Sequence, residues 1–297
     1  MSWPQGGAVS ALTLAAMIAV SVSVSPAPAR AARGASRGTV SVIYAGSLAA
    51  YMEDQFGPSF ERSSGYSFRG FGGGSTEDAS EIKGGVRVGD VFVSASASAD
   101  KLLEGKANGN WVSWYSTFAT SPLVLGYDPK STYGAELAHG KPWYQVLTQP
   151  GILVGRTEPT LDPKGVLTVE AIDNAAAKLH HPKLKSALSS FAVYPETALV
   201  GRLQSGQLDA GFFYAAEAAA AHIPTVGLRP AFKYALYTVT ILEGDPDPNG
   251  AAALVKYLLS STRQHTLKLG GFEALKPKFS GNAGAVPKSL RAAVGAG

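Results

Sequence analysis

The sequence predicts an α/β protein with two lobes, each a mostly parallel sheet flanked by helices. Short apolar segments with strand character alternate with segments of helical periodicity, the pattern of a parallel sheet covered by helices. Two strand-like segments, Pro122–Tyr127 and Tyr234–Leu242, divide the chain into three pieces. If both cross between lobes, residues 38–120 and 235–297 form one lobe and residues 121–234 form the other. We therefore expect a ligand cleft between the lobes, at the carboxyl ends of the strands.

Seven segments have the composition of strands. Thr39–Tyr44 (TVSVIY) is apolar, rich in β-branched residues, and leads directly into a turn of small residues. Tyr234–Leu242 (YALYTVTIL) is the longest alternating run in the chain. The other expected strands are Tyr66–Phe71, Asp90–Val93, Pro122–Tyr127, Ile152–Gly155 and Ala210–Tyr214.

Helical periodicity follows most of these strands and predicts the covering layers. The expected helices up to the last strand are Leu48–Arg62, residues 75–83, Ser98–Glu104, Trp143–Leu147, Gly165–Leu179, Pro195–Gln204 and Ala215–His222. Beyond Tyr234–Leu242 we expect mostly helix. The segments with that pattern are Asn249–Ser260, Arg263–Leu269 and Pro287–Val294.

Composition excludes several classes of function. The chain has 297 residues, of which 45% are hydrophobic and 16% charged, enough for a substantial core. The formal charge is +4, but the basic residues are scattered, so we expect no nucleic-acid partner. The chain contains no cysteine. This rules out disulfides, a thiolate nucleophile, a cysteine metal site and a lipoprotein anchor.

The first residues predict export. Ala11–Val24 is an apolar run of signal-peptide length, and small residues follow it between Ala27 and Ala32. We therefore expect residues 1–32 to be a signal peptide and the mature protein to be periplasmic or extracellular. The segment before the run has no Lys or Arg. The alternative is thus an uncleaved leader that keeps the protein at the membrane.

Two serines lie where strands lead into helices. Ser47 is in the turn after the first strand, and Ser75 closes the glycine-rich turn after the second. Hydroxyl and backbone N–H groups at a helix N-terminus favour an anion, because the helix dipole is positive there. The alternative is that each serine simply caps its helix. The glycine turn is neither a P-loop nor a dinucleotide fingerprint, because neither pattern of residues is present.

Two carboxylates also stand at expected helix starts. Asp162 precedes Pro163, a common pair of residues at the N-terminus of a helix. Glu196 follows Pro195, and an early acidic residue suits the helix dipole. Helix capping therefore accounts for both residues without a ligand.

Four motifs in the same order resemble one family. They are VIYAGSL at Val42–Leu48, the Gly-Ser turn at Ser75, GRTEPTLDPKG at Gly155–Gly165 and PETALVGRLQSGQLDAGFFY at Pro195–Tyr214, and the similarity covers most of the mature chain. Together they resemble the periplasmic molybdate/tungstate-binding proteins of ABC importers, and the tungstate-binding type more closely. The resemblance implies a type II periplasmic-binding-protein fold with the anion enclosed between lobes.

The resemblance also implies roles for five residues. Ser47 and Ser75 would donate hydroxyl hydrogen bonds to the oxyanion, and Tyr214 would reach it as well. Asp162 and Glu196 would bond the molybdenum or tungsten itself and make its coordination octahedral. A carboxylate beside a dianion is normally repulsive. A large Mo(VI) or W(VI) centre accepts six ligands and sulfur does not, so the two carboxylates would discriminate against sulfate.

We therefore expect a monomeric binding protein that is not an enzyme, uses no cofactor, and delivers its solute to ABC-transporter permease subunits. Within the same class, the alternative is a binding protein for sulfate, another small anion or a small organic solute. From another class, the alternative is a secreted serine hydrolase using Ser47 or Ser75 with a histidine. The chain lacks the Gly-x-Ser-x-Gly elbow of many such enzymes.

Overall fold

The computed structural model describes residues 36–297. The predicted signal peptide, residues 1–32, lies outside the described residues. Within them the strands form one mixed sheet in the order β2-β1-β3-β9-β4-β7-β5-β6, with β10 and β8 also pairing with β4. None of the helices described is long and apolar enough to cross a membrane.

The first half of the sheet begins with three parallel strands. β1 (Thr39–Ala45) lies between β2 (Ser67–Gly73) and β3 (Val91–Ser94). β9 (Tyr234–Ile241) pairs antiparallel with β3, so a late segment of the chain returns to its beginning. Both turns that carry the predicted anion-binding serines follow carboxyl ends of adjacent parallel strands.

The strand β4 (Trp114–Tyr127) joins the two halves of the sheet. Its first part pairs with β9 and with β10 (Glu273–Gly281), and its last part pairs with β7 (Ala210–Tyr214) and β8 (Thr225–Gly227). The second half continues from β7 through the short parallel strands β5 and β6. These span Val154–Arg156 and Ala192–Val193.

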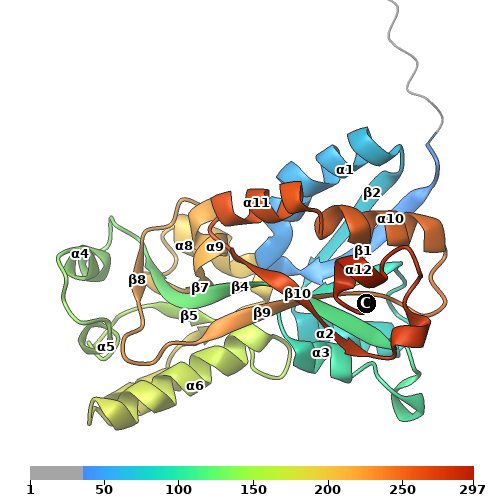
Figure 1. Ribbon diagram of the computed structural model, residues 1–297. Helices are drawn as coiled ribbons and strands as arrows, with labels where there is room; N and C mark the ends of the chain where they lie inside the picture. Colours follow the sequence, from blue (N-terminus) through green and yellow to red (C-terminus); the bar gives the residue numbers. More distant parts are fainter. Residues whose placement is uncertain (1–35) are drawn as a thin grey trace, which may run out of the picture. The chain divides into compact units, whose positions relative to one another are not determined.

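Helices cover both faces of the first half (Figure 1). Side chains alternate along β1 because successive residues of a strand point to opposite faces. Val42 packs in the core shared with α1 and α10, whereas Ile43 packs in the core shared with α2 and α3. The four helices are α1 (Gly57–Ser64), α2 (Ser75–Lys83), α3 (Ala97–Lys101) and α10 (Pro248–Leu258).

The second half is covered in the same way. Phe212 of β7 belongs to the core on the side of α6 (Pro163–Lys178), and Phe213 belongs to the core on the side of α8 (Leu199–Gln204) and α9 (Ala215–Ala220). The site residues therefore stand at the ends of strands held from both faces.

The remaining elements are short connections and the C-terminal helices. They are the single-turn helices η1 (Gly46–Leu48), η3 (Lys106–Asn108), η4 (Glu196–Ala198) and η5 (Ala283–Ala285), the π-helical segment η2 (Tyr51–Phe56), and α4 (Thr132–Ala138), α5 (Trp143–Val146), α7 (Lys183–Leu188), α11 (Ser261–Leu269) and α12 (Arg291–Val294).

The sequence-based prediction differs from the structure at the start of β4 and at the end of the chain, and it lacks the short elements β6, β8, α4 and α7. The strand begins at Trp114, earlier than the predicted Pro122, because the aromatic passage before Pro122 is itself part of the sheet. The end of the chain is helical at α10, α11 and α12 as expected, but β10 interrupts it. This strand contains Pro277 and several polar residues, so its own composition does not predict a strand. Its pairing with β4 stabilises the extended conformation. The lobe boundaries at residues 120 and 234 stay a prediction.

Candidate functional site

Ser47 lies in η1, directly after β1, and is almost wholly buried. Its Oγ is 3.1 Å from the hydroxyl oxygen of Tyr237 on β9, and either group can donate. Ser75 is the first residue of α2, and its Oγ accepts a hydrogen bond of 3.0 Å from the backbone N–H of Ala95. Neither serine is the N-cap of its helix, since those positions belong to Ala45 and Gly74. The helix-capping alternative is therefore wrong for both.

Asp162 is the N-cap of α6, as the Asp-Pro pattern predicts. Its Oδ1 accepts a 2.6 Å hydrogen bond from the backbone N–H of Lys164 and a 3.3 Å hydrogen bond from the hydroxyl of Thr157. Burial raises the pKa of Asp162, and the charge of Lys164 opposes that shift. Capping accounts for one oxygen of this carboxylate, and its ligand role stays a prediction.

Glu196 is the first residue of η4, so the predicted helix start is present but is only a single turn before α8. Its Oε1 accepts a hydrogen bond of 3.0 Å from Nζ of Lys164. Its Oε2 is buried and has no hydrogen-bond partner within residues 36–297. Burial raises the pKa of Glu196 to about 8 even though Lys164 opposes the shift. A carboxyl oxygen is thus held in the interior without the partner that buried polar atoms normally have.

Lys164, which was not among the predicted site residues, connects these groups. Lys164 is 0% exposed, and its Nζ contacts Oε1 of Glu196 at 3.0 Å and both carboxylate oxygens of Glu217 at 2.8 and 2.9 Å. Burial alone would lower the pKa of Lys164, but the charges of Glu196 and Glu217 outweigh it and raise the pKa. Lysine is rarely buried unless it is paired. The partners lie 32 and 53 residues away in sequence, so local patterns could not reveal them.

Tyr214 ends β7 and is the N-cap of α9. Its backbone N–H donates to Oε2 of Glu217 at 3.2 Å, and its ring lies 5.5 Å from Nζ of Lys164. Its hydroxyl is buried and has no partner among the residues described. The environment of Glu196 thus contains a second buried polar side chain whose hydrogen-bonding capacity is unused.

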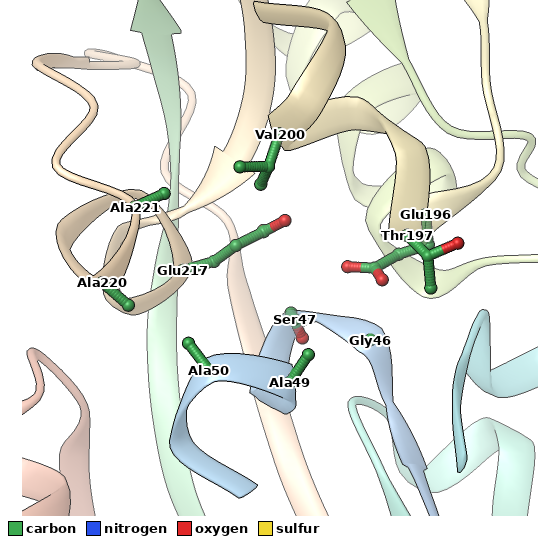
Figure 2. A pocket seen from close by; sticks show the side chains of 10 residues that line it. All are labelled: Gly46, Ser47, Ala49, Ala50, Glu196, Thr197, Val200, Glu217, Ala220 and Ala221. Carbon is green, nitrogen blue, oxygen red and sulfur yellow. The ribbon is translucent and has the colours of Figure 1, made fainter. Parts of the chain in front are cut away.

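Two cavities meet at Glu196. The first, of about 220 Å³, is lined by η1, η4 and α9, including Ser47, Glu196 and Glu217. Figure 2 shows Glu196 and Glu217 pointing toward one another from two sides, above the turn that carries Ser47. The second, of about 260 Å³, lies between Gly74 and the segment that ends at Asp162. Both are smaller than typical sites for drug-sized molecules and suit a small solute.

Three of the five predicted residues therefore line the cavities, and two do not. Ser47 lines the first cavity, Asp162 the second, and Glu196 both. Ser75 and Tyr214 are buried nearby and line neither cavity. Within residues 36–297, no three His, Asp or Glu side chains are grouped so as to hold a free metal ion.

Segments from the two halves of the sheet touch around these cavities. The backbone N–H of Glu77 in α2 donates to the carbonyl of Leu161 at 2.9 Å. A Cβ atom on Gly74 would lie 2.6 Å from that same carbonyl oxygen, and one on Gly46 would lie 1.6 Å from Oε2 of Glu196. Glycine at both positions permits backbone to approach so closely that the site is enclosed.

The model of the bacterial extracellular solute-binding protein family matches residues 40–273. This chain belongs to that family. The predictions of a solute-binding protein and of a protein that is not an enzyme are thereby confirmed. Two relatives and one solved structure add detail to this family assignment.

One relative is a Haloferax volcanii protein named as an ABC transporter molybdenum-binding protein. It is 30% identical over 228 residues, which cover 76% of this chain and 68% of that protein. Another is the molybdate/tungstate-binding protein WtpA of Pyrococcus abyssi, 22% identical over 310 residues that cover 85% of this chain and 89% of that one.

Among solved structures, the periplasmic molybdate-binding protein of Azotobacter vinelandii has a similar fold. The TM-score is 0.63 at 19% identity, and the match covers 78% of this chain and 98% of that chain. The predicted two-lobed α/β fold of periplasmic binding proteins is confirmed.

Proposed function

We propose that this solute-binding protein captures molybdate or tungstate outside the cytoplasm and delivers it to the permease of an ABC importer. The observation that carries the proposal is Oε2 of Glu196, a buried carboxyl oxygen without a partner among the described residues, at the junction of two small cavities. The names of the Haloferax and Pyrococcus relatives support the same choice of solute.

The chemistry of the site supports an oxyanion with an electron-poor central atom. Two carboxylates, Glu196 and Glu217, bind the single ammonium group of Lys164, and a third, Asp162, accepts from the backbone N–H of the same residue. An ordinary dianion would be repelled by the excess of negative charge. A central molybdenum or tungsten atom can accept a carboxylate oxygen as an additional ligand, and this bond would compensate for the repulsion. Sulfate has no such compensation.

In this proposal three of the five predicted residues donate hydrogen bonds to the anion and two bond its metal atom. Ser47 and Ser75 supply hydroxyl donors, and Tyr214 supplies the hydroxyl that now has no partner among the described residues. Glu196 bonds the metal through Oε2, and Asp162 bonds it from the second cavity. For Ser75 and Tyr214, which line neither cavity, contact requires a small adjustment of the site when the anion enters.

The transport context completes the proposal. Residues 1–32 act as a signal peptide, and the mature protein works as a periplasmic or extracellular monomer without a cofactor. The membership in an extracellular family supports this location.

Calorimetric titration of the purified protein with molybdate, tungstate, sulfate and phosphate tests the proposal. We expect saturable binding of one molybdate or tungstate per chain and little heat from sulfate or phosphate. Equal binding of all four anions, or binding of sulfate alone, would contradict it.

A further inference from the structure

The charged group beneath the cavities has an unusual composition. Lys164 is the ammonium partner of two carboxylates that both line the first cavity, Glu196 and Glu217. All three side chains are buried, at 0%, 3% and 7% exposure. Asp162 accepts a hydrogen bond from the backbone N–H of Lys164, so three carboxylates and one ammonium group lie in this cluster, with an excess of two negative charges if all are ionised.

Lys164 has no donor to spare for a solute. A lysine ammonium group carries three N–H donors. Three carboxylate oxygens lie between 2.8 and 3.0 Å from Nζ, one from Glu196 and two from Glu217. An anion in the first cavity therefore contacts the carboxylate oxygens of Glu196 and Glu217. It does not contact the ammonium group of Lys164, which those carboxylates surround.

The same contacts orient Glu196. Its Oε1 is engaged by Lys164, so moving the carboxylate out of this position would break an ion-pair hydrogen bond in a buried setting. Glu217 holds Lys164 in turn and is itself fixed by the backbone N–H of Tyr214. One cluster thus links the starts of α6, η4 and α9 and leaves Oε2 of Glu196 as the oxygen without a partner in the described chain.

We propose that Lys164 and Glu217 are positioning residues for the solute. Lys164 holds Glu196 so that Oε2 points to the anion. Glu217 adds a negative charge that repels the anion and so lowers its affinity. This rests on the proposed function. The two residues have opposite effects on affinity, which separates this role from a purely structural ion pair. Removing the charge of Glu217 relieves repulsion, whereas removing the ammonium group releases Glu196.

Two variants test these effects in the full mature chain. In Glu217→Gln the single amide oxygen can still accept from Lys164 and Tyr214 at the place of Oε2, the second contact to Lys164 is lost, and one negative charge is removed. We expect tungstate to bind about tenfold more tightly, since one charge fewer near a dianion is worth about 1.4 kcal/mol or more in a buried site. Sulfate affinity, measured by competition against tungstate, should rise as well, since relief of repulsion acts on any dianion.

The double variant Lys164→Gln with Glu217→Gln keeps the formal charge of the cluster and removes the ammonium group. We expect tungstate binding to weaken about tenfold or more while the weak sulfate binding changes little, so that the preference for tungstate falls. The matched control is Lys233→Gln with Glu170→Gln, which removes an ion pair between α6 and the chain before β9, away from the cavities. Its tungstate affinity should equal that of the native protein.

Each outcome decides the question. If Glu217→Gln weakens tungstate binding, or if the double variant keeps native affinity and selectivity, the proposed positioning role is wrong. Should the double variant fail to fold by circular dichroism, Glu217→Gln still decides the role of Glu217, because a structural ion pair predicts no gain in affinity. If the native protein binds neither molybdate nor tungstate, the proposed function itself has failed, and this is seen before any variant is made.

Discussion

Oε2 of Glu196 lies against the backbone of Gly46, so closely that a Cβ atom at residue 46 would stand 1.6 Å from it. The two residues come from different halves of the sheet, one following β1 and the other preceding α8. Their contact encloses the first cavity on one side. A residue other than glycine at this position would have to displace the carboxylate or hold the two segments apart.

The first prediction follows from this contact. Gly46→Ala should weaken tungstate binding about tenfold or more, because the methyl group occupies the place of Oε2. Gly201→Ala is the matched control, since Gly201 lies in α8 with nothing within 4 Å of its Cβ position. That variant should bind normally and gain about 0.5–1 kcal/mol of stability. Calorimetry and urea denaturation measure both effects, and normal binding by Gly46→Ala would refute the enclosure.

The second prediction separates capping from metal coordination at Asp162. Asp162→Asn keeps an acceptor for the backbone N–H of Lys164 but supplies a much poorer metal ligand. We expect it to weaken tungstate binding nearly as much as Asp162→Ala, which also loses about 1 kcal/mol of stability with the cap. If Asp162 only caps α6, Asp162→Asn binds tungstate like the native protein.

The coordination number tests the same proposal from the side of the ligand. X-ray absorption of the tungstate complex should report six oxygen neighbours around the metal. In Glu196→Gln the number should fall, and affinity should fall with it. A tetrahedral spectrum for the native complex would mean that neither carboxylate bonds the metal.

The third prediction concerns thermal stability. An anion that binds only the folded protein raises the free energy of unfolding by mass action, by about 2.7 kcal/mol at a concentration 100 times its Kd. Molybdate and tungstate should therefore raise the melting temperature in a concentration-dependent way, and sulfate should do so little. Equal shifts with all anions at equal ionic strength would indicate general electrostatics.

The fourth prediction is a pH dependence of stability from Asp100 in α3. This residue is fully buried, accepts hydrogen bonds from Thr238 and Ser94 through Oδ2, and has a pKa raised to about 7 by burial. Because the folded pKa exceeds the unfolded value, the folded state binds the proton more tightly. Its contribution is complete below about pH 4 and is lost as the pH rises through about 7.

Asp100→Asn removes this titration. The free energy of unfolding should fall less between pH 5 and pH 8 than in the native protein, by about 1 kcal/mol or more. Urea denaturation at the two pH values measures the difference. A variant that loses stability in parallel with the native protein would show that Asp100 is not a source of the dependence.

Much of the fold could be predicted because it is local. The apolar run at Thr39–Ala45 predicts a strand, and the Asp-Pro pair predicts the helix cap at Asp162. β10 did not show, because pairing with β4 and not its own composition makes it a strand. Lys164 could not be assigned either. Its burial depends on Glu196 and Glu217, which reach it only after three helix starts have been brought together.

The strand β4 continues from one half of the sheet into the other, and β9 runs beside it with a register irregularity between Thr117 and Ala119. If the halves separate to admit a solute, β4 bends, because this one strand pairs in both halves. The ladder of hydrogen bonds is locally disrupted at such an irregularity, so fewer of them oppose bending at that point. The speed with which a captured anion escapes would then be governed by the stiffness of this ribbon, so substitutions far from the anion could alter its residence time without altering any contact to it.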